Sequence, residues 1–579
     1  MKHLFADYPK AMERSTAFDE MFSHDGSLRP DYSGVNDVLQ SLTGSDVSAR
    51  AEAMARTFLD RGVTFDFAGE ERAWPLDIVP RIIPGQEWNS ISAGVAQRVT
   101  ALEMFLNDVY DRMEIVRDGV LPRSLITSSA HFHREVHGFG TPGGVRVHIS
   151  GVDLVRDDVG TFRVLEDNLR VPSGVSYVLE NRQAIAKGLP EAFSGAAIRP
   201  VEEYPRRLLS ALRRTAPEGV DDPTVVVLTP GVYNSAYFEH TLLAGMMGVE
   251  LVEGRDLVCR GNRVYMRTTE GEQRVDVIYK RLDDDFLDPL QFRADSMLGV
   301  PGLVNSARDG NVTIANAVGN GVADDKLIYT YVPDIIRYYL AEEPIIPNVD
   351  TYRLEEAQAR EEVMDRLEEL VVKPVDGSGG KGLVIGPDAT PGELEELRRK
   401  VLADPRGWIA QPVLQLSTVP TLADGSFGPR HVDLRPFAIN DGDDVWVLPG
   451  GLTRVALTEG SLVVNSSQGG GSKDTWVVDQ DGDAGTAVST AVPWSNRRRS
   501  QSAQRVWPSA FHTDANPSDA YDEQQQQQNQ GLQVRSPAPP QPDKSRAGSP
   551  RRRDQHREQQ QQQNQASSGG VPDARGGAD

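Results

Sequence analysis

A strand–helix–strand unit between residues 224 and 254 constrains the fold of this chain most strongly. The run TVVVLTPG is rich in β-branched residues and ends in Pro-Gly, NSAYFEHTLLAGMMG predicts a helix with a glycine stop, and VELVEG predicts a second strand. Two strands joined by a helix of this length are parallel and connected by a right-handed crossover. RVDVIYKRL predicts a further strand. We therefore expect an α/β domain around a parallel sheet in residues 201–310.

A pair of antiparallel strands is predicted in residues 145–168. The runs VRVHISGVDLVR and TFRVLEDN flank a turn at residues 157–160. Glu166 and Asn168 are two positions apart and share one face of a strand, and Asp153 can lie beside them if the strands pair. Three oxygen donors suit magnesium, which prefers hard oxygen ligands and keeps water or phosphate oxygens as the remainder. We predict that Asp153, Glu166 and Asn168 bind this metal; a solvated strand face is the alternative.

A glycine-rich loop follows the predicted strand LVVKP, which carries Lys373 near its end. Glycines let backbone N–H groups approach phosphate oxygens closely. The loop is not a P-loop, because Gly-Lys-Gly stands where Gly-Lys-Ser or Gly-Lys-Thr would be required. A plain glycine hairpin is the alternative to a phosphate-binding loop. The predicted phosphate-binding residues are Lys373, Gly377, Ser378, Gly379, Gly380 and Lys381.

Arginines on two later strands are candidates for binding phosphate or carboxylate. In the predicted strand HVDLRPFAI, Asp433 and Arg435 alternate and share a face, and Arg454 lies on the following strand. A guanidinium makes planar, two-pronged contacts with such anions, although a cross-strand Asp–Arg pair is the simpler reading. Asn465 belongs to another loop at a strand end. Lys326, near a predicted helix start, could contact a phosphate or be a solvated helix lysine.

Two further helices are predicted outside the strand–helix–strand unit, the second of them from its apolar spacing. One is expected over residues 48–61. The other is expected from Ser92, where Val95, Val99, Leu102 and Leu106 recur at the interval of a buried helix face. The segment WPLDIVPRIIPGQEW before it predicts an irregular entry into that helix.

Composition excludes several classes of protein. A net charge of −23 argues against general binding to nucleic acid, whose phosphates an acidic surface repels. Cys259 is the single cysteine, so intramolecular disulfides are impossible. With neither a long apolar run nor an apolar N-terminal signal, we expect a cytoplasmic protein without a membrane span. His131, His133 and His137 lack an evident fourth donor, so we interpret them as structural.

The tail over residues 491–579 has the composition of a disordered segment. It contains two glutamine runs, PAPPQP and two RRR clusters, and too little apolar surface to offset the entropy of ordering. The arginines would suit an acidic protein partner, and a solvated tail without specific function is the alternative.

Taken in order, these segments resemble the ATP-grasp superfamily, and more closely its circularly permuted bacterial branch. LEDNLRVPSGVSYVLENR and VVNSSQGGGSKDTW are the most family-specific strings. In ordinary ATP-grasp proteins the Asp…Glu-x-Asn piece comes last, whereas here it precedes the glycine loop. The resemblance identifies Lys326 as the early lysine and Gln411-Pro412-Val413 as the adenine hinge, where many relatives carry glutamate. It also assigns nucleotide contacts to Gln411, Val413 and Asn465.

The resemblance implies an α/β (α+β), circularly permuted ATP-grasp fold of five regions. Residues 1–90 form a helical and irregular region, and residues 91–200 carry the displaced magnesium-binding piece. Residues 201–310 form the α/β domain that precedes the nucleotide-binding piece in ordinary members. Residues 311–490 bind the nucleotide, and residues 491–579 are the tail.

The resemblance also implies an ATP- and Mg²⁺-dependent ligase. A carboxylate substrate, small or peptidic, would be activated as an acyl phosphate and attacked by an amine. Arg454, Arg435 and Lys381 would stabilise the transferring phosphate. Two alternatives stay open: an ATP-dependent phosphotransferase, and a non-catalytic protein that binds nucleotide or a partner.

Overall fold

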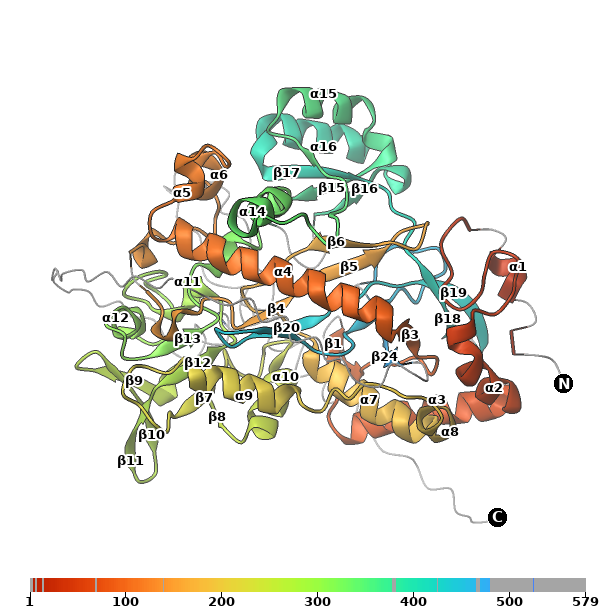
Figure 1. Ribbon diagram of the computed structural model, residues 1–579, viewed down its shortest axis with the longest axis horizontal. Helices are drawn as coiled ribbons and strands as arrows, with labels where there is room; N and C mark the ends of the chain where they lie inside the picture. Colours follow the sequence, from red (N-terminus) through yellow and green to blue (C-terminus); the bar gives the residue numbers. More distant parts are fainter. Residues whose placement is uncertain are drawn as a thin grey trace, which may run out of the picture. The chain divides into compact units, whose positions relative to one another are not determined.

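The computed structural model describes nine ranges of the chain (Figure 1). Three predicted parts of the chain lie outside these ranges. They are the tail (except for Gln524), Gly377 to Lys381 of the glycine loop, and Asn465. Within the described part, no helix is long and apolar enough to cross a membrane. The ranges are residues 4–5, 8–12, 15–67, 70–138, 140–376, 382–423, 425–464, 469–479 and 524.

The predicted strand–helix–strand unit forms a parallel four-stranded sheet of order β13-β12-β7-β8. The inner strands β7 (VVVL) and β12 (VIYK) are buried along their whole length, as expected in a parallel sheet with both faces covered. The edge strand β13 comes from just beyond the range predicted for this domain. Helices α9 and α10 contact the sheet. Its elements are α9 (Tyr204–Arg214), β7 (Val225–Leu228), α10 (Tyr237–Met247), β8 (Glu250–Val252), β12 (Val277–Lys280) and β13 (Thr313–Ala315).

A second sheet, of order β14-β17-β15-β16, is antiparallel. The predicted strands LVVKP and WIAQPV pair here, so that Lys373 lies opposite Ile409 and Val371 opposite Gln411. Two helices share an apolar core with this sheet, and Figure 1 shows both above it. Its elements are β14 (Tyr352–Arg353), α15 (Ala357–Asp365), β15 (Leu370–Pro374), β16 (Val384–Ile385), α16 (Pro391–Ala403) and β17 (Trp408–Pro412).

In a three-stranded sheet of order β21-β20-β4, a strand that precedes the glycine loop in sequence joins strands that follow it. The predicted strand VRVHISGVDLVR is in fact two: β4 pairs with β20, and β5 pairs with β6. HVDLRPFAI is likewise interrupted, and Leu434 makes an isolated bridge to Leu154 of β5. The strands are β4 (Ile149–Gly151), β5 (Asp153–Arg156), β6 (Phe162–Glu166), β19 (Ser426–His431), β20 (Phe437–Asn440), β21 (Val445–Val447) and β22 (Thr453–Val455).

Helix α4 (Gly85–Val109) is the helix predicted from Ser92, but it begins already at Gly85. The predicted irregular entry is confirmed for residues 74–80, which form no helix or strand, whereas β3 (Arg81–Pro84) pairs in parallel with β24 (Thr475–Val478). A side chain at Gly85 would collide with the carboxylate of Asp479, so glycine permits this close approach. In Figure 1, α4 (orange) extends from near α14 to β3, and it contacts both.

The remaining elements complete the N-terminal region and the connections. The predicted helix at residues 48–61 is α3, which starts at a capping box of Thr43 and Asp46. The helices are α1 (Tyr8–Met12), α2 (Ser33–Ser41), α3 (Gly44–Asp60), α5 (Glu114–Arg117), α6 (Arg123–Thr127), α7 (Val175–Gly188), α8 (Pro190–Ser194), α11 (Asp284–Leu287), α12 (Leu303–Arg308), α13 (Lys326–Tyr329) and α14 (Val332–Leu340). The strands are β1 (Thr64–Phe67), β2 (Glu70–Ala73), β9 (Leu257–Arg260), β10 (Arg263–Thr268), β11 (Gly271–Val275), β18 (Thr418–Ala423) and β23 (Gly471–Lys473).

Candidate functional site

The β5–β6 hairpin places the predicted metal ligands together. Asp153 is the direct ladder partner of Glu166, at a point where the register shifts by a bulge. The Asp153 side chain is almost completely buried, whereas the Glu166 side chain keeps 27 % of its surface exposed. Asn168, just beyond β6, is half-buried. The hairpin therefore presents Glu166 and Asn168 more openly than Asp153.

The segment after β6 is held by partners on three sides. Asp167 points away from its two neighbours and makes a two-pronged ion pair with Arg98 of α4, at 2.6 and 2.7 Å. The Leu169 carbonyl accepts hydrogen bonds from Asn316 and Asn320, and the Leu169 N–H donates to Asp324. These bonds determine which face Glu166 and Asn168 occupy.

Arg98 and Asp324 were missed by the sequence analysis. The string LEDN did contain a signal for a partner such as Arg98. Its aspartate, Asp167, lies between two residues that face outward, so its carboxylate must point inward and needs a buried cation. Asp324 carried no comparable pattern. Burial raises the pKa of Asp324 to about 6, against the opposing effect of the Arg170 guanidinium.

Both predicted arginines converge on Asp153. Arg435 donates to both Asp153 oxygens, from Nε at 2.5 Å and from Nη2 at 2.7 Å. Arg454 reaches Asp153 Oδ2 at 2.6 Å and also makes a two-pronged contact with Asp433. Two carboxylates and two guanidiniums thus form one charge-balanced, buried cluster, which we call the arginine cluster.

The arginine cluster shifts the acidity of both of its carboxyl groups. Burial by itself raises the pKa of Asp153, but Arg435 and Arg454 outweigh it and hold the pKa well below its usual range. Burial also raises the pKa of Asp433, and the opposing effects of Arg454 and, more weakly, Arg435 do not reverse that shift. Asp153 is therefore an ionised anchor for two cations at neutral pH.

The two predicted lysines that the structure describes contact Glu166 and Gln411 respectively. Lys326 Nζ is 3.5 Å from Glu166 Oε2. Lys373 Nζ donates to Gln411 Oε1 at 2.6 Å, and Gln411 Nε2 donates to Thr351 at 2.9 Å. The predicted hinge residue Gln411 thus contacts the predicted phosphate-binding lysine, while Val413 follows the end of β17.

Electrostatic coupling links the two halves of the site. Burial lowers the pKa of Lys373 to about 8; Glu166 and Asp153 oppose this shift, and Lys326 adds to it. Lys326 joins the two halves directly, because its Nζ contacts Glu166 and its backbone N–H donates to the carbonyl of Val375, two residues after Lys373, at 3.3 Å. The displaced acidic piece and the strand before the glycine loop therefore meet, although more than 200 residues of the printed sequence separate Asp153 from Lys373.

The donors present fit a magnesium ion better than a softer metal. Glu166 and Asn168 each carry a side-chain oxygen, the type of donor that magnesium prefers. Among the residues that the structure describes, no group of three or more His, Cys, Asp or Glu side chains could hold a metal. An ion at this place would need the Asn168 amide and non-protein oxygens, as magnesium commonly does.

The histidines near this region have structural contacts. Burial and the nearby Arg170 hold the pKa of His131 well below its usual value, so its ring is neutral. His133 Nε2 lies 3.8 Å from Asp284, which also accepts the Gly319 N–H and pairs with Lys280. Burial of His131 and the Asp284 contact of His133 favour structural roles for these two, whereas the role of His137 stays a prediction.

Residues 80–456 match the family described as circularly permuted ATP-grasp type 2. The chain belongs to this family. The match confirms the fold and the permuted order inferred from the resemblance, and ATP binding is the family's defining property. The match does not test the roles of the individual site residues, which stay predictions.

Several relatives are similar along most of the chain. An uncharacterized protein of Mycobacterium leprae is 61 % identical over 477 residues, covering 82 % of this chain and 85 % of the relative. An uncharacterized protein of Synechocystis is 52 % identical over 80 % of this chain and 97 % of its own length. A Frankia casuarinae protein named "Putative glutamate--cysteine ligase 2-2" is 44 % identical over 81 % of this chain, but only 55 % of that protein is covered.

A solved structure shares the fold at low sequence identity. A glutathione synthetase-like effector of Globodera pallida in its apo form superposes with a TM-score of 0.51 and 11 % identity. The alignment covers 76 % of this chain and 98 % of the effector. At this identity the likeness supports the architecture alone.

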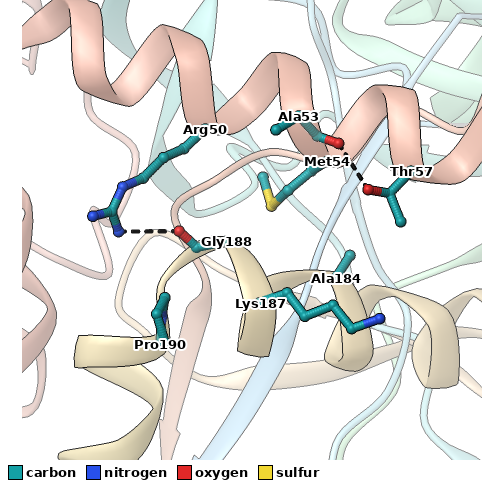
Figure 2. Close-up of a pocket in the computed structure, with 8 residues that line it drawn as sticks. All are labelled: Arg50, Ala53, Met54, Thr57, Ala184, Lys187, Gly188 and Pro190. Carbon is teal, nitrogen blue, oxygen red and sulfur yellow. Dashed lines mark hydrogen bonds between the residues drawn. The ribbon is translucent and has the colours of Figure 1, made fainter.

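A separate cavity of about 260 Å³ lies between α3 and the α7–α8 junction (Figure 2). Met54, Ala184 and Pro190 provide its apolar lining. Arg50 at its edge donates to the Gly188 carbonyl and pairs with Glu191, so its charge is already balanced. None of its lining residues belongs to the site around Glu166.

Proposed function

We propose that this protein is an ATP- and Mg²⁺-dependent ligase that activates a carboxylate as an acyl phosphate and joins it to an amine. The observation that carries the proposal is the contact of Glu166 with Lys326, whose backbone N–H is bonded to Val375 just after Lys373, so that the acidic hairpin and the lysine-bearing strand lie together. Carboxylates for a metal and lysines for phosphates are the parts that phosphoryl transfer from ATP requires.

The proposed nucleotide site divides into two sets of residues. Lys326 and Lys373 would bind phosphate oxygens, with Gln411 orienting Lys373 through the bond already present. Glu166, Asn168 and Asp153 would hold magnesium, which supplies charge neutralisation to the phosphates when bound. Gly377 to Lys381 and Asn465 keep their predicted nucleotide contacts.

The proposed chemistry needs no protein nucleophile. An oxygen of the substrate carboxylate attacks the γ-phosphorus, and the bond to the β–γ bridging oxygen breaks to release ADP. The amine then attacks the acyl carbon, loses a proton to solvent and expels phosphate. Arg454 and Arg435 would stabilise the negative charge on the transferring group, since a guanidinium matches phosphate oxygens in pairs.

Amino acids or short peptides are the proposed substrates. The support is the name of the Frankia relative, which refers to glutamate and cysteine, together with the family's ATP-grasp fold. A cytoplasmic location is proposed with them, because ATP is supplied there and the chain has one cysteine.

Hydroxylamine trapping tests the reaction class. The purified chain is incubated with MgATP, hydroxylamine and pools of amino acids and dipeptides, and hydroxamate and ADP are measured. A ligase yields both in equal amounts, because hydroxylamine intercepts the acyl phosphate. ADP with a phosphoester stable to hydroxylamine would establish a phosphotransferase instead. Nucleotide binding without ADP formation from any pool would indicate a non-catalytic binding protein.

Nucleotide affinity is expected to fall as pH rises through about 8. Lys373 has its pKa lowered to about 8 by burial, so it is charged at pH 7 and loses its proton above that value. If phosphate binding requires the charged form, the dissociation constant for MgATP increases by about tenfold per pH unit well above the pKa. Calorimetry between pH 6.5 and 9.5 measures this. The guanidinium introduced by Lys373→Arg stays charged over this pH range. If MgATP affinity still decreases with rising pH in that variant, the effect belongs to another group.

A further inference from the structure

Arg170 is paired more loosely than other buried arginines of this chain. Its side chain is 16 % exposed, and its contacts with the carboxylates of Asp283 and Asp324 are 3.3 and 3.4 Å long. Arg98 and Arg182 pair with carboxylates at 2.6 and 2.9 Å. The Nε atom of Arg170 is buried without a hydrogen-bond partner among the described residues. A guanidinium has several N–H donors, so Arg170 keeps donor capacity for an anion.

The contacts of Arg170 adjoin the pair of Glu166 and Lys326. Arg170 follows Glu166 by four residues, and Asp324 precedes Lys326 by two. These two short segments touch twice: the Leu169 N–H donates to Asp324 at 2.6 Å, and Lys326 Nζ lies 3.5 Å from Glu166. Arg170 therefore lies at the edge of the proposed nucleotide site.

Asp283 brings the carboxyl edge of the parallel sheet to the same place. In the sheet order β13-β12-β7-β8, the chain leaves β7 toward β8 and leaves β12 in the opposite direction, toward β13. Asp283 follows the end of β12 by three residues. The crevice between strands whose connections diverge in this way is where open α/β sheets bind ligands. The loose ion pairs of Arg170 thus lie where the sheet topology favours a binding site.

Gly321 allows the stem of Arg170 to pack closely. A side-chain carbon at Gly321 would lie 3.0 Å from Arg170 Cδ and 2.8 Å from His131 Cβ. The aliphatic stem of Arg170 is therefore packed against the chain, while its guanidinium stays loosely paired. Such a group is preorganised for an anion, because little side-chain freedom remains to be lost on binding.

We propose that Arg170 binds the α-carboxylate of an amino-acid substrate, and that Asp283 and Asp324 receive its ammonium group. This inference deepens the proposed function, on which it rests for the presence of a substrate. A guanidinium flanked by two carboxylates is complementary to a zwitterion, which carries both charges on neighbouring groups. A simple carboxylic acid would gain the first contact but would bring its charge close to two further carboxylates. The α-carboxylate held by Arg170 is not the group that is activated.

Equilibrium dialysis tests this binding without turnover. The full chain is dialysed against a mixture of the common amino acids, with and without Mg²⁺ and the non-hydrolysable analogue AMP-PNP, and mass spectrometry identifies what is retained. Wild type should retain at least one amino acid, and Arg170→Gln should bind it about tenfold more weakly, because a charged hydrogen-bonded contact is lost. Retention of no amino acid by wild type under either condition, or equal affinity in Arg170→Gln, would overturn the inference.

Arg163→Gln is the matched control. Arg163 lies at the other end of β6 and makes a closer pair, with Asp157 at 2.7 Å. The substitution removes the same charge from the same hairpin. The affinity of this variant for the retained amino acid should equal that of wild type, and a loss as large as in Arg170→Gln would contradict a specific role for Arg170.

Two analogues of the retained amino acid separate recognition from a purely structural role of Arg170. Its α-amide lacks the carboxylate, so it should bind wild type about tenfold more weakly and should bind Arg170→Gln with the same affinity as wild type. Its N-acetyl derivative lacks the ammonium group and should also bind wild type more weakly. If Arg170 only stabilises the surrounding fold, Arg170→Gln will weaken the amino acid and its α-amide by the same factor, which contradicts the inference.

Hydroxylamine trapping distinguishes failure of this inference from failure of the proposed function. Amino-acid binding with the expected dependence on Arg170, but without hydroxamate from any pool, would refute the ligase reaction and support the zwitterion site. Hydroxamate formation together with equal amino-acid affinity in wild type and Arg170→Gln would support the ligase and overturn the zwitterion site.

Discussion

Replacing Glu166 with glutamine is expected to reduce ATP turnover by about a hundredfold to a thousandfold. The glutamine keeps the size of the side chain and the backbone register opposite Asp153, but it removes the exposed negative charge of the proposed metal site. Because Glu166 has one ion-pair partner among the described residues, Lys326 at 3.5 Å, its loss should leave the melting temperature nearly unchanged. ADP release and thermal unfolding are measured on the same preparation.

Glu343→Gln is the matched control for this prediction. Its carboxylate is exposed and pairs with Arg337 on the surface, so the substitution changes the same charge away from the site. It should leave turnover unchanged. Glu166→Gln retaining more than about half of the wild-type rate would contradict the proposed role of Glu166. Asp153 is a less informative target, because its removal also leaves Arg435 and Arg454 without their shared anchor.

Replacing Arg454 with methionine is expected to lower the free energy of unfolding by about 3–5 kcal/mol at pH 7. The substitution fills a similar volume but leaves Asp433, whose side chain is 1 % exposed, without its ion-pair partner. A buried, unpaired carboxylate must either remain charged at high cost or take up a proton. Urea unfolding at fixed temperature measures the change.

Two comparisons separate this effect from simple loss of packing. Arg454→Met combined with Asp433→Asn removes the stranded charge and should restore part of the stability. The pKa of Asp433 is already raised by burial, so the loss in Arg454→Met should shrink as pH falls and this carboxyl is protonated. Arg337→Met, at an exposed ion pair, should cost less than about 1 kcal/mol. An Arg454 variant as stable as that control would show that the arginine cluster contributes little.

The local elements were largely predictable because they depend on short-range patterns. The β-branched run of β7, the glycine after α10 and the apolar repeat of α4 each specify an element within a few residues. The errors occurred where distant segments override local preference. Directly before α4, residues 81–84 are a strand because they pair with β24, and the break between β4 and β5 separates pairing with β20 from pairing with β6.

The candidate site was predicted unevenly for the same reason. The Glu166-x-Asn168 spacing and the Lys373 strand are visible in the sequence, since side chains two apart on a strand share a face. The sharing of Asp153 by Arg435 and Arg454 is not visible, because the alternative of a surface Asp–Arg pair fits the sequence equally well. Arg98, in helix α4, and Asp324, in a loop, both hold the Glu166–Leu169 segment. The residues around each of them in the sequence do not indicate this partner.

The amino-acid sequence by itself determined the family, the permuted order of its segments and the residue types available for nucleotide chemistry. These follow from motif spacing and from the periods of strand and helix, which are properties of neighbouring residues. Only the tertiary structure decided that Asp153 is buried beneath two guanidiniums while Glu166 stays open, and that Asp433 anchors one arginine and not the other. Burial and charge pairing arise from contacts between segments hundreds of residues apart, and such contacts exist only once the chain has folded.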